Sequence, residues 1–158
     1  HTQPLSGLHA SSAPPDGRAV RLGHGVRRAE DIRIVDRTEE TTEVGLGLIA
    51  QWVKDNEIAL ETSPGSNLQT GAFSQWGTEL IDHPFDLLYQ LGFRVTLNTD
   101  NLLMSSTTIT RELGLLTDTF CYGLDDLHVF QVNAAWSAFL SIEDSEELME
   151  RIDAGFGR

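Results

Sequence analysis

Hydrophobic and polar positions along this chain form short blocks with one of two spacings. Compact apolar runs that end in polar or glycine-rich residues are typical of strands in a buried sheet, and three such runs occupy residues 19–23, 57–61 and 93–97. Apolar positions three or four residues apart predict helices over residues 42–56, 82–92, 108–120, 124–140 and 145–152. Strands separated by helices predict an α/β fold whose parallel strands are joined by crossovers.

Residues at the ends of these blocks place the boundaries. Thr42 is expected to cap the helix over residues 42–56, because its hydroxyl can accept a hydrogen bond from an amide of the first turn. Pro84 suits the first turn of the next helix, and Gly92 suits its end. Residues 62–67 are rich in Pro, Gly and Ser, so a loop is predicted there.

The first twenty residues differ from the rest of the chain. Residues 2–20 follow neither spacing and are rich in Pro, Ser and Gly, which predicts irregular structure. We interpret residues 1–20 as an irregular, divergent junction segment and residues 21–158 as the folded part. A chain of 158 residues with 40% hydrophobic composition can bury one core, but it is short for a complete eight-unit β/α barrel.

Charge and composition exclude several classes of partner. The formal net charge is -13 and only 11 residues are Lys or Arg, which argues against nucleic acid because such surfaces need clustered basic residues. No apolar run approaches the length of a membrane span, and the first residues lack a signal-peptide pattern. The single cysteine, Cys121, rules out an internal disulfide. We therefore expect a cytoplasmic protein that acts on a small molecule.

Polar side chains gather where the predicted strands end. His24 lies between two glycines after the first strand, Glu61 ends the second, and Asp100 follows the third. Active sites of parallel barrels form at these carboxyl ends, because the loops there converge on one face. From the residues alone, His24 is either a ligand or acid–base group, or a histidine bonded to a loop carbonyl. Asp100 is likewise either a metal ligand or a turn cap, and Glu57 is expected at a solvated edge.

Four short motifs follow one another along the chain. They are RLGHGV at residues 21–26, SNLQTG at 66–71, LNTD at 97–100 and NAAWSAFL at 133–140. Each motif is weakly specific alone, but their order and their placement on the predicted elements resemble the adenosine deaminase family. The resemblance covers residues 21–142, and residues 50–61 also look like bacterial members of that family.

This resemblance implies a fold, a cofactor and a reaction. The fold would be the C-terminal half of a TIM-type (β/α)8 barrel followed by C-terminal helices. The family holds one catalytic zinc ion with three histidines and one aspartate. The metal lowers the pKa of a bound water, and the resulting hydroxide attacks C6 of a purine nucleoside. A glutamate protonates the purine ring and ammonia leaves, so adenosine or deoxyadenosine becomes inosine or deoxyinosine.

Three residues of this sequence carry family roles by their place in the motifs. Asp100 matches the aspartate that binds zinc, and His24 matches the histidine that orients the attacking water. Asn101 stands where many members carry a second aspartate that contacts the purine. Its amide can both accept and donate hydrogen bonds, so a substrate-binding role is retained in the prediction.

The sequence departs from the family before residue 21. The family's His-Ala-Gly-Glu motif supplies a zinc-binding histidine and the proton-donating glutamate. His1 lies at a matching separation from His24 and is the predicted metal ligand, with His9 as the alternative. Thr2-Gln3-Pro4 replaces Ala-Gly-Glu, so neither Gln3 nor Pro4 supplies the acid, and the chain contains no His-x-His pair. His1 and Asp100 make at most two ligands, so we expect the chain alone to bind zinc weakly and to be inactive.

Three hypotheses therefore follow from the sequence. The leading one is a partial chain of an adenosine deaminase, and the alternative is a non-catalytic, deaminase-like scaffold that binds nucleosides or a partner protein. The third is an α/β module without nucleoside chemistry. A half-barrel leaves sheet edges and apolar strand residues such as Leu60 and Val95 exposed. We thus expect self-association, pairing with a missing barrel half, or cover from residues 1–20.

Overall fold

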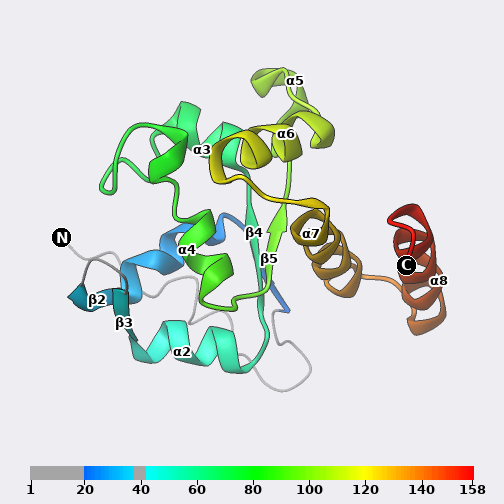
Figure 1. Cartoon of the computed structure of the whole chain (residues 1–158), viewed down its shortest axis with the longest axis horizontal. Helices are drawn as coiled ribbons and strands as arrows, with labels where there is room; N and C mark the ends of the chain where they lie inside the picture. Colours follow the sequence, from blue (N-terminus) through cyan, green and yellow to red (C-terminus); the bar gives the residue numbers. More distant parts are fainter. Residues whose placement is uncertain (1–19, 38–41) are drawn as a thin grey trace.

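A parallel sheet of three strands lies at the centre of the molecule, whose computed structural model describes residues 20–37 and 42–158 (Figure 1). The strands are β1 (Arg21–Leu22), β4 (Ala59–Thr62) and β5 (Val95–Leu97), in the order β1-β4-β5. Both neighbouring pairs are parallel, with Leu22 opposite Leu60 and Leu60 opposite Val95. The three strands predicted from the sequence are confirmed, each shorter than predicted. Because all are parallel, their carboxyl ends meet at one edge.

Helices connect and cover these strands. In chain order they are η3 (Gly25–Asp31), α2 (Leu48–Asp55), α3 (Pro64–Thr70), η4 (Leu80–Asp82), α4 (Phe85–Gln90), α5 (Leu102–Ser105), α6 (Ile109–Phe120), α7 (Leu124–Trp136) and α8 (Ile142–Gly155). In the view of Figure 1, α2 and α4 lie to the left of β4 and β5, and α7 and α8 lie to their right. The mixed α/β class with a parallel sheet is therefore confirmed. Among residues 20–37 and 42–158, none of the helices combines the length and the hydrophobicity that a membrane span requires.

The core lies between the sheet and these helices. Leu60 and Val95 are fully buried and Leu97 almost so, packed with Val53 of α2 and Phe130 of α7. The expectation that the apolar strand residues would face water is therefore wrong for these three. Their side chains share the sheet face that the helices cover, because alternate strand residues point to the same face.

The largest difference from the sequence-based prediction lies between β1 and β4. Residues 42–46 do not begin a helix: β3 (Thr42–Leu46) pairs antiparallel with β2 (Ile32–Arg37). Apolar residues that stand two apart, such as Val44 and Leu46, fit a strand as well as a helix. The helix begins only at Leu48, and Asp31 caps it in place of Thr42. The Oδ2 atom of Asp31 accepts hydrogen bonds from two first-turn amides, at 3.0 and 2.8 Å.

Helix boundaries elsewhere differ by smaller amounts. Helix α3 occupies part of the predicted loop, because proline suits the first turn of a helix and Pro64 stands there. Helix α6 begins one residue later than predicted and is capped by Thr108, whose Oγ1 accepts from the Arg111 amide at 3.2 Å. Helix α7 ends at Trp136 rather than residue 140. Helix α8 begins earlier than predicted, with Ser141 as its cap.

An aromatic cluster joins α4 to α7 and to the connection before it. Its rings meet mostly edge to face, and its members are Phe85, Tyr89, Tyr122 and Phe130. The Tyr89 hydroxyl donates to Asp126 Oδ1 and the Tyr122 hydroxyl donates to Asp86 Oδ1, each at 2.8 Å. Burial and the hydrogen-bonded carboxylate raise the pKa of Tyr89 to about 12, and raise that of Tyr122 further. Both hydroxyls therefore stay protonated and act as donors.

Candidate functional site

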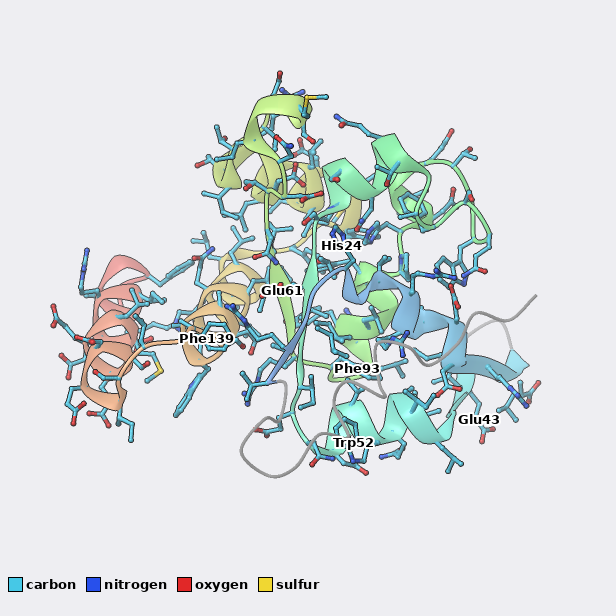
Figure 2. All side chains as sticks on the ribbon, turned by 180° about the vertical axis from the view of Figure 1, so that it is seen from behind. His24, Glu43, Trp52, Glu61, Phe93 and Phe139 are labelled. Carbon is cyan, nitrogen blue, oxygen red and sulfur yellow. The ribbon has the colours of Figure 1, made fainter. Side chains whose placement is uncertain are left out.

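A pocket of about 420 Å³ lies at the carboxyl edge of the sheet. It is lined by residues at or just after the carboxyl ends of the three strands, together with one residue of α6: Gly23, His24, Glu61, Ser63, Leu97, Asn98, Thr99, Asp100 and Ile109. Two predicted site residues, His24 and Asp100, therefore line one pocket although they stand 76 positions apart in the sequence, as the convergence of loops at this edge predicts. Figure 2 shows His24 next to the end of the sheet, near Glu61 of β4.

His24 is held at the pocket by a tight turn. Its backbone is left-handed, with a φ of 53°, and it directly precedes η3. The next residue, Gly25, packs so closely on β4 that an added Cβ would lie 2.8 Å from the Cβ of Leu60. Glycine is therefore required there, and the turn leaves the His24 side chain exposed. Within the described residues, that imidazole has no hydrogen-bond partner.

Asp100 has a defined partner in the loop after β4. The Ser66 hydroxyl donates to its Oδ2 atom at 2.6 Å, and Ser66 is itself almost fully buried. Asp100 has a left-handed backbone with a φ of 56°, a conformation that costs free energy for a residue other than glycine. The hydrogen bond fixes one carboxylate oxygen at the rim of the pocket.

Asn101 has a structural role next to Asp100. Its Oδ1 accepts from the Met104 amide at 3.0 Å and so caps α5. This bond uses the acceptor atom of the side chain, which leaves the amide NH₂ as the group for a substrate contact. Asn101 is not among the residues that line the pocket. The structure therefore does not join it to His24 and Asp100.

Glu61 brings a second carboxylate into the pocket, as its place at the end of a strand suggested. Its Oε1 lies 3.0 Å from Nε of Arg21, and both side chains are about 30% exposed. The Arg21 guanidinium also stands 3.9 Å from the ring centre of Phe139. An ion pair that is partly exposed adds little stability, so its main effect is to orient Glu61. Glu57 forms an exposed ion pair with Arg94 at the opposite end of the strand.

A buried histidine that the sequence did not single out supports the pocket wall. His83 Nδ1 accepts from the Phe85 amide at 3.1 Å, and Nε2 lies 3.1 Å from Oδ1 of Asn67. Nδ1 is an acceptor, so Nε2 carries the proton and donates to Asn67. Asn67 Oδ1 also accepts from the Ser63 amide at 3.4 Å. Burial lowers the pKa of His83 to about 4, and the ring is therefore neutral near pH 7.

The described residues fall short of a complete zinc site. No group of three His, Cys, Asp or Glu side chains that could hold a metal ion occurs within residues 20–37 and 42–158. The predicted ligand His1, its alternative His9, and Gln3 lie outside the described residues. A catalytic zinc ion takes three or four protein ligands, so Asp100 and His24 do not fit such an ion by themselves.

Most of the chain resembles one protein family. The model of the adenosine deaminase family matches residues 11–155. The chain belongs to the adenosine deaminase family. This confirms the resemblance that the four motifs indicated.

Individual relatives in the family agree. The adenosine deaminase of Mycobacteroides abscessus is 46% identical over 135 residues, which are 85% of this chain and 35% of that protein. Adenosine deaminase 1 of Streptomyces coelicolor is 47% identical over 126 residues, or 80% of this chain and 30% of that protein. The chain thus spans about a third of the length of the curated relatives it matches.

Solved structures show the same fold at low sequence identity. The adenine deaminase of Arthrobacter aurescens matches with a TM-score of 0.75 and 17% identity, covering 98% of this chain and 41% of that one. The N6-methyl-AMP deaminase of Arabidopsis thaliana matches with a TM-score of 0.59 and 22% identity, covering 66% of this chain and 30% of that one. At these identities the likeness concerns the fold alone.

Proposed function

We propose that this chain forms the C-terminal part of an adenosine deaminase active site. The reaction is the zinc-dependent hydrolysis of adenosine or deoxyadenosine to inosine or deoxyinosine and ammonia. The observation that carries the proposal is that His24 and Asp100 line one pocket at the carboxyl edge of the sheet. The relatives named adenosine deaminase support it.

Each site residue has a role in this proposal. His24 hydrogen-bonds the attacking water and orients it toward C6 of the purine. Asp100, with one oxygen bound to the Ser66 hydroxyl, would offer its other oxygen as one ligand of a zinc ion. Asn101 donates from its amide to the purine. His1, which lies outside the described residues, would be a second ligand.

We further propose that the sheet is the C-terminal half of a (β/α)8 barrel, with residues 1–20 as a divergent junction. Three parallel strands joined by helical crossovers support this arrangement. We propose that the protein is cytoplasmic. The isolated chain is proposed to bind zinc weakly and to lack turnover, because two protein ligands are too few for a catalytic zinc ion. It is also proposed to associate with itself or with a complementary barrel half.

A chimaera tests the catalytic proposal. Residues 21–142 would replace the matching segment of the Streptomyces coelicolor adenosine deaminase 1, and conversion of adenosine would be followed by ultraviolet absorbance. We expect the chimaera to turn over adenosine. His24→Ala or Asp100→Ala should lower the turnover rate at least about 100-fold. Asp55→Asn, a change at an exposed surface residue, should leave the turnover rate unchanged. A folded, zinc-loaded chimaera without turnover would contradict the proposal. Separately, one zinc per chain with turnover in the isolated chain would contradict its proposed inactivity.

A non-catalytic scaffold is the second candidate function. The absence of a three-residue metal group within the described part of the chain favours it. It predicts an inactive chimaera together with binding heat when purine riboside is titrated into the intact chain. Calorimetry with purine riboside on the parent and on Asp100→Ala separates the remaining possibilities. A scaffold that binds nucleosides gives binding heat, whereas a module without nucleoside binding gives none.

A further inference from the structure

A buried carboxylate lies behind the pocket and is not explained by the proposed reaction. Glu112, in the first turn of α6, has no exposed surface. Its Oε2 accepts from the Gly65 amide at 2.9 Å, and its Oε1 accepts from the Thr107 hydroxyl at 2.8 Å. None of the ion pairs among the described residues includes Glu112. Burying a carboxylate costs free energy unless hydrogen bonds compensate it. These two hydrogen bonds therefore hold the Glu112 carboxylate, the Gly65 amide and the Thr107 hydroxyl in fixed positions relative to one another.

The backbone at Gly65 is shaped around this carboxylate. A Cβ at Gly65 would lie 2.4 Å from Oε1 of Glu112, which is closer than real atoms approach. Glycine therefore allows the carboxylate to reach the amide at the start of α3. The bond crosses 47 positions of sequence and ties the loop after β4 to the helix after β5.

Ser66, the residue after Gly65, links the restrained loop to the pocket residue Asp100. Ser66 is 6% exposed, and its hydroxyl holds Oδ2 of Asp100 at 2.6 Å. Asp100 itself lies on the exposed side of the loop in a left-handed backbone conformation. Its carboxylate orientation therefore depends on where Ser66 is placed. Thr107, the second partner of Glu112, precedes α6, whose first residue Ile109 also lines the pocket.

We infer that Glu112 is a positioning residue of the candidate site. It fixes the Gly65 amide, which sets the place of Ser66, and the Ser66 hydroxyl then orients the carboxylate of Asp100. Through Thr107 the same carboxylate holds the loop that leads into α6. The functional meaning of this relay rests on the proposed role of Asp100. The geometric relay can be tested without a metal or a nucleoside.

The test measures the side-chain carboxyl signal of Asp100 in the full chain by ¹³C NMR with labelled aspartate, assigned with Asp100→Asn. We expect Glu112→Ala and Ser66→Ala to shift this signal in the same direction, and Glu112→Gln to return it toward the parent position. A glutamine keeps an acceptor for the Gly65 amide and can donate to Thr107. The double variant Glu112→Ala/Ser66→Ala should shift the signal no further than Ser66→Ala alone.

A matched control separates positioning from general loss of stability. Tyr122→Phe removes a hydroxyl–carboxylate hydrogen bond in the aromatic cluster and should leave the Asp100 signal in place. An unmoved signal in folded Glu112→Ala, or additive shifts in the double variant, would overturn the inference. If Glu112→Ala does not fold, Gly65→Ala decides, because its methyl group displaces the carboxylate and must also shift Asp100. An inactive chimaera would leave these results untouched, so the two proposals fail separately.

Discussion

The buried imidazole of His83 makes the stability of this chain depend on pH. Its pKa is lowered by burial from 6.5 to about 4, and its Nδ1 accepts the Phe85 amide, so the folded chain holds the ring neutral. Between pH 6.5 and about 4, the His83 imidazole is protonated in the unfolded chain but stays neutral in the folded chain. The full stability is therefore present above pH 6.5 and is lost progressively as the pH falls toward about 4. The loss totals about 3 kcal/mol, or about 1.4 kcal/mol per pH unit.

Urea unfolding from about pH 7 to about pH 4.5, followed by circular dichroism, measures this effect. His83→Gln is expected to be less stable than the parent at pH 7 by about 1–3 kcal/mol, because the Phe85 amide loses its acceptor. The variant should also lose less stability on acidification, and the gap between the two proteins should narrow. Equal slopes for parent and His83→Gln would refute the reasoning.

Three further substitutions test other parts of the structure by the free energy of unfolding. Tyr122→Phe leaves Asp86 without a buried donor and should cost about 1.5–3 kcal/mol, whereas no change would mean that the hydroxyl is solvated. Asp31→Ala removes the acceptor of two α2 amides and should cost about 1 kcal/mol with a loss of helical signal. Gly25→Ala places a methyl group against Leu60 and should cost about 1–3 kcal/mol, and a neutral result would contradict the close packing.

Local signals explain which elements could be predicted. The strands β4 and β5 are short apolar runs between breakers, and Thr108 before α6 is a standard helix cap. The hairpin of β2 and β3 was missed because Val44 and Leu46 fit two periods, and only the pairing with the preceding strand decides between them. Local spacing therefore predicts a regular element more reliably than it distinguishes strand from helix in short segments.

The candidate site also contains residues that the sequence predicted and residues that it did not. His24 and Asp100 were predicted because each follows a strand, and parallel strands bring such positions to one edge. The supports behind them were not predicted, since neither His83 nor Glu112 follows a pattern that marks its partner. His83 meets Asn67 from 16 positions away, and Glu112 meets the Gly65 amide from 47.

The α/β class, the three parallel strands and the family can be predicted from the amino-acid sequence, because these depend on local spacing and on short motifs in order. The side chains that hold the site in place become apparent only once the chain is folded. Asp100 is oriented by Ser66, and the start of α3 is tied to Glu112. These hydrogen bonds join residues that are far apart in sequence, and their geometry exists only after the helices have packed on the sheet.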